Sequence, residues 1–178
     1  MRVFGLVLSF GMLSAGAAWA EPCQTLDELR ADQDARYLAG AVRGCVADER
    51  YVDAVQTFWA YSNFALFDQQ RVRDESAHVA VQELHGWIFS GYSFAIIGEL
   101  KKVIAELRDP DGVFLATTCR GVAKAGPPEY RPTYMIKRGM IPRKTEDDWK
   151  VAGFDADAAW QKALVEINGC PVGVVAER

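Results

Sequence analysis

The chain has 178 residues, half of them hydrophobic, and a formal net charge of −4 at pH 7. A chain of this length and composition can bury the core of a single globular domain. Its mildly acidic balance, without a cluster of Lys and Arg, argues against binding to nucleic-acid phosphates.

The N-terminal sequence MRVFGLVLSFGMLSAGAAWAEPC is typical of a secretory signal peptide. The basic Arg2 precedes an apolar run, and the triplet AWA at residues 18–20 matches a signal-peptidase site. The run is short for a bilayer span, so a retained anchor helix is the less favoured alternative. We expect cleavage after Ala20 and export to the periplasm. Loss of one basic and no acidic residue would leave a net charge of −5. The residues before Cys23 do not resemble a lipobox, and no later apolar run is long enough to span a membrane.

All four cysteines follow the expected cleavage site. An even number of cysteines in an exported protein indicates two disulfides. Four cysteines allow three pairings, and their order along the chain favours Cys23–Cys45 with Cys119–Cys170. A zinc site is the competing interpretation, which is disfavoured because the sequence has no C-x-x-C spacing.

Helical signals dominate the first two thirds of the chain. Thr25 and Glu28 form the capping-box pattern with which a helix begins. Apolar residues then recur at helical spacing in four stretches, which are residues 38–46, 51–62, 72–88 and 93–107. Pro110 and Gly112 end the last of these stretches, because both are turn residues.

The pattern weakens over residues 109–154, where we expect one irregular segment. The sequence VFLATTC indicates either a short strand or a buried helix, AGPPEYRP a loop, and TYMIKRGM an extended stretch. A last helix is predicted between Asp155, as its N-cap, and Gly169, as its C-terminal stop. The expected fold is therefore a single all-α domain over residues 21–178, with five to seven antiparallel helices, stapled by disulfides.

The stretch RYVDAVQTFWAY resembles the second helix of a tetratricopeptide or Sel1-like repeat. Tyr51, Ala54 and Phe58 fall where that family places an aromatic, a small and an aromatic residue. The resemblance covers about residues 36–64, and no second copy follows at a suitable period. The pattern departs from the family at two positions, which are Glu49 and Tyr61. The resemblance implies an antiparallel helix hairpin and binding to another protein.

Both histidines lie in the stretch RVRDESAHVAVQELHG. On one continuous helix Asp74 would face His78, and His85 would follow two turns later, about 10 Å away. One metal ion does not easily bridge that distance, and further donors would have to come from other helices. We therefore favour a solvated helix face, on which Asp68 and Arg71 also have the spacing of a weak surface pair. A metal site at Asp74, His78 and His85 is the alternative.

The loop from Gly126 to Gly139 combines prolines, which donate no backbone hydrogen bond, with aromatic and basic side chains. Such a loop either covers the core or binds a partner from a rigid scaffold. Tyr, Met and Arg are enriched at protein interfaces. We predict a partner-binding surface formed by Tyr130, Arg131, Tyr134, Met135, Lys137 and Arg138.

The sequence contains neither the G-x-S-x-G motif of a serine hydrolase nor a phosphate-binding P-loop. We therefore expect no catalytic activity and no cofactor. The leading hypothesis is a non-enzymatic periplasmic protein that binds another protein, as an inhibitor, an immunity-type protein or an envelope accessory factor. The alternative is a metal-dependent enzyme or metal-binding protein that uses Asp74, His78 and His85.

Overall fold

The computed structural model describes residues 20–108, 112–142, 145 and 147–170. Over these residues it contains seven α-helices and two short 3-10 helices, and its β-type pairing is one isolated antiparallel bridge between Val72 and Lys150. The predicted all-α class is confirmed. None of the described helices is long and apolar enough to cross a membrane. Residues 1–19, on which the signal-peptide prediction depends, lie outside the described residues.

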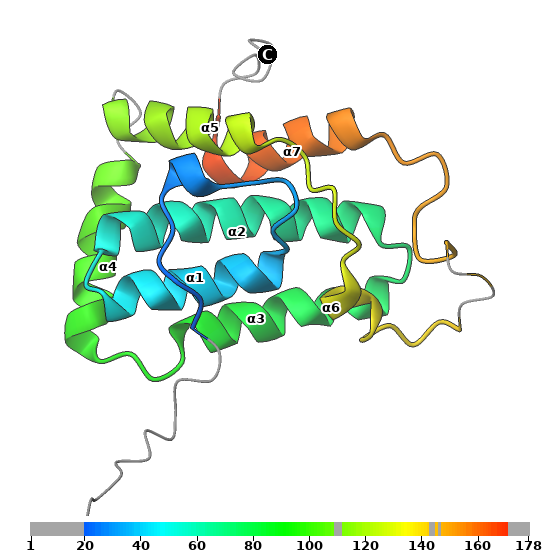
Figure 1. Ribbon diagram of the computed structural model, residues 1–178, viewed down its shortest axis with the longest axis horizontal. Coiled ribbons are helices and arrows are strands. Elements are labelled where there is room, and N and C mark those ends of the chain that lie inside the picture. The colour runs from blue at the N-terminus through cyan, green and yellow to red at the C-terminus, as the bar shows by residue number, and fades with distance from the viewer. Residues whose placement is uncertain (1–19, 109–111, 143–144, 146, 171–178) are drawn as a thin grey trace, which may run out of the picture.

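Helix α2 (Tyr51–Arg71) lies at the centre of the molecule. Helices α1 (Ala35–Ala47) and α7 (Ala156–Asn168) pack along it (Figure 1). Because α2 is covered on more than one side, it buries more aromatic residues than one helical stripe could hide. Its largest buried side chains are Tyr61, Phe64 and Phe67.

Helix α4 (Phe94–Leu107) runs across the end of the bundle where α1 passes into α2 (Figure 1). Its Leu100 and Leu107 pack against Ala54 and Val55 in a second core cluster. Helix α3 (Val79–Phe89) lies beside α1 and contributes the buried Ile88 to the main core. The apolar faces of α3 and α4 thus pack against the hairpin formed by α1 and α2.

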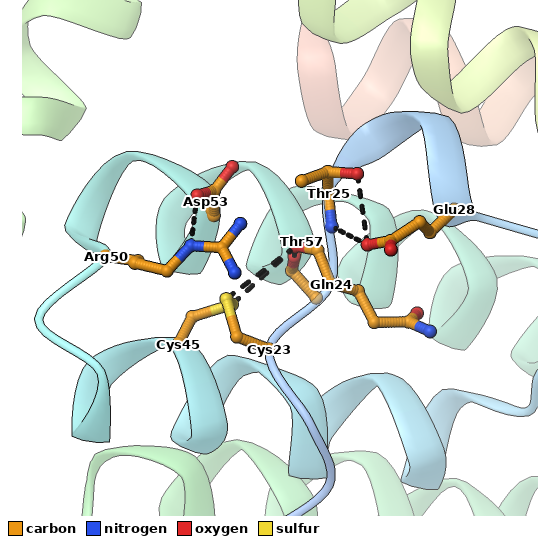
Figure 2. Close-up of a disulfide and its surroundings, with 8 residues drawn as sticks. All are labelled: Cys23, Gln24, Thr25, Glu28, Cys45, Arg50, Asp53 and Thr57. Carbon is orange, nitrogen blue, oxygen red and sulfur yellow. Dashed lines mark hydrogen bonds and ion pairs between the residues drawn. A yellow bond between two sulfur atoms is a disulfide. The ribbon is translucent and has the colours of Figure 1, made fainter.

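The segment before α1 is held down at its beginning by a disulfide between Cys23 and Cys45. Next to it, the backbone carbonyl of Gln24 accepts a hydrogen bond from the buried Thr57 hydroxyl of α2, at 3.1 Å (Figure 2). The bond and the disulfide fix the segment to both helices of the α1–α2 hairpin.

A second disulfide joins Cys119, on α5 (Val113–Ala125), to Cys170 after α7. The ends of α7 are those predicted. The Asp155 carboxylate accepts a hydrogen bond from the Ala158 amide at 3.0 Å, and Gly169 adopts a left-handed conformation with φ of 63°. Both disulfides match the pairing favoured by the sequence.

The segment predicted to be irregular contains two helices, α5 and the short α6 (Thr133–Ile136). Thr117 and Thr118 obscured the helical period of α5, because β-branched residues also favour strands. In the structure their hydroxyls donate to the carbonyls four residues earlier, at 2.8 and 3.0 Å, as threonines inside helices do.

The predicted continuous helix over residues 72–88 is interrupted. Helix α2 ends at Arg71, Val72 is extended, and a 3-10 helix, η2 (Glu75–His78), precedes α3. The Asp74 side chain caps η2 by accepting from the Ser76 amide at 3.0 Å. The capping box at Thr25 likewise begins only a three-residue 3-10 helix, η1 (Leu26–Glu28).

Candidate functional site

A fully buried carboxylate, Asp68 near the end of α2, organises the segment that was predicted to bind a partner. Its Oδ1 accepts a hydrogen bond from Arg71 Nε at 2.9 Å, and Arg71 Nη2 lies 2.7 Å from the same oxygen. Its Oδ2 accepts from the Tyr130 and Tyr134 hydroxyls, both at 2.8 Å. The carboxylate therefore ties the C-terminal turn of α2 to residues more than sixty positions later in the chain.

Burial raises the pKa of Asp68 to about 6, against the Arg71 charge and the donated hydrogen bonds, which favour the carboxylate. All of these partners donate to the group, which favours its ionised form. Burial and the Asp68 charge raise the pKa of Tyr130 and Tyr134 well above its usual range, so both phenols stay neutral donors.

The buried Arg71 makes further contacts with the same segment and with Trp149. Its Nη1 donates to the Pro128 carbonyl at 3.0 Å. Its guanidinium carbon lies 4.9 Å from the ring centroid of Tyr130 and 5.8 Å from that of Trp149. The Asp68–Arg71 pair is thus a buried ion pair, and the sequence-based interpretation of a weak surface pair was wrong.

The structure divides residues 126–142 into two parts with different surroundings. In the inner half, residues 126–136, Tyr130 and Tyr134 bond to Asp68, Met135 is fully buried and Arg131 is half-buried. In the outer half, residues 137–142, Lys137 and Arg138 are exposed. The six residues predicted to bind a partner therefore do not lie together on one exposed surface.

The backbone of the outer half is bonded to η2. The Ile141 amide donates to Asp74 Oδ2 at 2.7 Å, and the Met140 amide donates to the Ser76 hydroxyl at 3.0 Å. A Cβ atom at Gly139 would collide with the Asp74 carboxylate unless that side chain moved, so this approach favours glycine. Met140 is nonetheless 81% exposed and Ile141 52% exposed. Two apolar side chains therefore project from a backbone that side-chain hydrogen bonds hold in place.

A shallow hollow of about 480 Å³ lies between the outer half and η2. Its lining combines the apolar outer half with charged and polar side chains, and consists of Arg73, Asp74, Glu75, Ser76, Met140, Ile141 and Pro142. Sequence analysis missed Met140 and Ile141, because apolar residues in an irregular segment are expected to point inward. The available signal was the Gly-Met-Ile-Pro order, in which the flanking residues favour a turn.

The three residues of the predicted metal alternative have separate neighbours. Asp74 bonds to Ser76 and to the outer half, and these bonds lower its pKa. His78 Nε2 lies 3.2 Å from the Val72 carbonyl oxygen. The His85 ring centroid lies 5.2 and 5.3 Å from those of Phe58 and Phe89. Within the described ranges, no group of three or more His, Cys, Asp or Glu side chains could hold a metal ion. The metal alternative stays a prediction.

A second groove, of about 420 Å³, opens between the segment before Cys23, the beginning of α1 and α3. It is lined by Glu21, Asp34, Arg36, Tyr37, Leu84 and Trp87. Sequence analysis gave these residues no role, because Glu21 and α3 are far apart in the chain and only the fold brings them together.

Comparisons with protein-family models, with curated protein sequences and with solved structures gave no significant match. The resemblance of α1 and α2 to a tetratricopeptide or Sel1-like hairpin therefore remains an expectation, and functional inference depends on the sites themselves.

Proposed function

We propose that this chain is an exported, non-enzymatic protein that binds another protein through the outer half of its 126–142 segment. The observation that carries this proposal is the exposure of Met140 and Ile141, 81% and 52%, on a backbone bonded to Asp74 and Ser76. Binding residues are frequently carried by loops on a rigid scaffold, and interaction sites expose neighbouring apolar side chains.

The fixed backbone favours binding, because little conformational entropy is left to lose when the partner docks. Met140 and Ile141 also follow directly after a segment that is anchored in the core through Asp68. In this proposal Tyr130 and Tyr134 position the outer half, and Lys137 and Arg138 contact the partner.

The charged side chains around the outer half indicate the chemistry of the partner. Lys137 and Arg73 are exposed beside it, and Arg138 pairs with Glu83 of α3 at 2.7 Å. Asp74 and Glu75 line the same hollow, so charged groups of both signs surround Met140 and Ile141. They fit a partner that offers an apolar pocket with charged groups of both signs at its rim, since opposite charges at an interface rim favour association.

Two features support export to the periplasm. The N-terminal sequence has the order of a signal peptide. Both disulfides are of a kind that persists in oxidising compartments. An inhibitor, an immunity-type protein or an envelope accessory factor would each have these properties.

Site-specific photo-crosslinking tests the proposal, because it captures whichever protein contacts the outer half. A benzophenone side chain is placed at Met140 in the exported protein, and in a matched control at Phe94, which is 99% exposed on α4. We expect a discrete protein adduct from position 140 that is absent from position 94. No adduct at position 140, or the same adducts at both positions, would contradict the proposal.

A further inference from the structure

The groove between α1 and α3 has the size and lining of a small-molecule site. Its volume of about 420 Å³ falls within the range of ligand pockets in proteins. Tyr37, Leu84 and Trp87 form its apolar walls, and Glu21 and Asp34 add two carboxylates. This combination limits which ligands can bind.

The aromatic walls are fixed by contacts outside the groove. The Tyr37 hydroxyl accepts a hydrogen bond from Gln24 Nε2 at 3.1 Å. The Arg43 guanidinium carbon lies 5.0 Å from the ring centroid of Trp87. Arg43 Nη1 also donates to the carbonyls of Trp87 and Ser90, at 2.7 and 3.0 Å. These contacts satisfy Arg43 at the C-terminal end of α3 and hold the Trp87 ring in position.

Both carboxylates stand on fixed backbone. The Glu21 carbonyl lies against Gly44 so closely that a Cβ at that position would collide with it, and the disulfide of Cys23 follows two residues later. Asp34 Oδ1 accepts from the Tyr37 amide at 2.7 Å, as the N-cap of α1. The lining has two acidic side chains and one basic side chain, the exposed Arg36, and the expected cleavage after Ala20 adds the α-ammonium group of Glu21.

We propose that this groove binds a small organic cation, an alkylammonium group on a short apolar stem. Aromatic faces attract ammonium groups, and neighbouring carboxylates strengthen that attraction. The apolar stem would lie against Leu84. A neutral ligand of the same shape would cover Glu21 and Asp34 without offering them a charge, which is unfavourable. An anion would be repelled by both carboxylates. This site is independent of the protein-binding outer half proposed above.

Calorimetric titration of the folded chain with choline, and with its neutral isostere 3,3-dimethylbutan-1-ol, tests the charge requirement. We expect saturable choline binding that is at least tenfold tighter than binding of the neutral alcohol. Choline that does not bind saturably, or equal binding of both compounds, would overturn the proposal.

Variants then test the location. Trp87→Leu should weaken choline binding at least tenfold, and Glu21→Gln at least threefold. The matched controls on α4, Phe94→Leu and Glu99→Gln, should bind choline as the unchanged chain does. Because Trp87→Leu could also disturb the fold, Leu84→Lys provides a second test, since it places a cation of the chain itself in the groove. Unchanged choline binding in Leu84→Lys would show that the groove is not the site.

Discussion

The inner and outer halves of the 126–142 segment are neighbours in sequence, but they are held by two different carboxylates in opposite environments. The inner half is bonded to Asp68, which is fully buried and paired with Arg71. The outer half is bonded to Asp74, which lies near the surface and caps a 3-10 helix. Burial raises the pKa of Asp68, whereas donated hydrogen bonds lower that of Asp74.

The comparison shows how an irregular segment can present exposed apolar residues without being loose. Four prolines deprive the segment of regular backbone pairing. Side chains outside the segment bond to part of its backbone: Arg71 donates to the Pro128 carbonyl, and Asp74 and Ser76 accept from the Ile141 and Met140 amides. Asp68 holds the inner half through the hydroxyls of Tyr130 and Tyr134. The inner attachment contributes stability, and the outer attachment determines the position of Met140 and Ile141.

The largest effect is expected from removal of the inner carboxylate. Asp68→Ala leaves the Arg71 charge buried without its counter-ion, which should lower the free energy of unfolding by about 3–5 kcal/mol. Urea denaturation measures the loss. In the matched control Asp32→Ala, which breaks an exposed pair with Arg30, the loss should be at most about 1 kcal/mol. Similar losses in the two variants would show that burial does not determine how much the Asp68–Arg71 pair contributes to stability.

A smaller effect is expected from Tyr134→Phe, which keeps the ring and removes the hydroxyl that donates to Asp68. Hydrogen bonds to charged groups contribute about 1.5–3 kcal/mol, and we expect a loss in that range from urea denaturation. In an Asp68→Ala background the same change should cost almost nothing. If the two losses were additive, Tyr134 would not act through Asp68.

Acid should change the contributions of Asp68 and Asp74 to stability in opposite directions. Because the pKa of Asp68 is raised from its ordinary value to about 6, the folded state binds its proton more tightly than the unfolded state does. The contribution of Asp68 to stability is therefore greatest below its ordinary pKa and decreases as the pH rises to about 6. The lowered pKa of Asp74 has the opposite sign, so its contribution is lost as the pH falls.

Carboxyl NMR titration measures both midpoints directly. We expect that of Asp68 above, and that of Asp74 below, the ordinary aspartate value. In addition, the decrease in stability from pH 4 to 6 should be steeper in the unchanged chain than in Asp68→Asn. A midpoint of Asp68 below the ordinary value would contradict the assignment.

The smallest effect on stability is expected from Gly139→Ala, because its new Cβ meets Asp74 at the surface rather than in the core. We expect a loss of at most about 1 kcal/mol, together with loss of the photo-crosslinked adduct at position 140. The control Gly86→Ala, where nothing lies within 4 Å of the added Cβ, should keep the adduct. An unchanged adduct in Gly139→Ala would show that partner binding does not depend on how the outer half is positioned.

Sequence reasoning predicted the elements that depend on local chemistry. The caps of α7, the all-α class and the pairing of cysteines by chain order agree with the structure. Local pattern did not reveal that Asp68 is buried, because the spacing from Asp68 to Arg71 is the same for an exposed and a buried pair. Burial there depends on Tyr130 and Tyr134, which only the tertiary fold brings to α2.

The candidate sites were less predictable for the same reason. Met140 and Ile141 project outward because Asp74 and Ser76 bond to their amides, an arrangement between residues more than sixty positions apart. The α1–α3 groove likewise needs the tertiary approach of Glu21 to Trp87. The spacing of apolar residues indicates which face of a helix is buried. It does not indicate which distant side chain forms hydrogen bonds with the backbone of a loop.

Amide hydrogen exchange at Met140 and Ile141 tests the central claim, that the outer half is exposed yet fixed, most directly. We predict that both amides exchange at least tenfold more slowly than in an unstructured peptide of the same sequence. The protection of Ile141 should disappear in Asp74→Ala while the amides of α2 remain protected. Exchange of both amides at the unstructured rate in the unchanged chain would contradict the account.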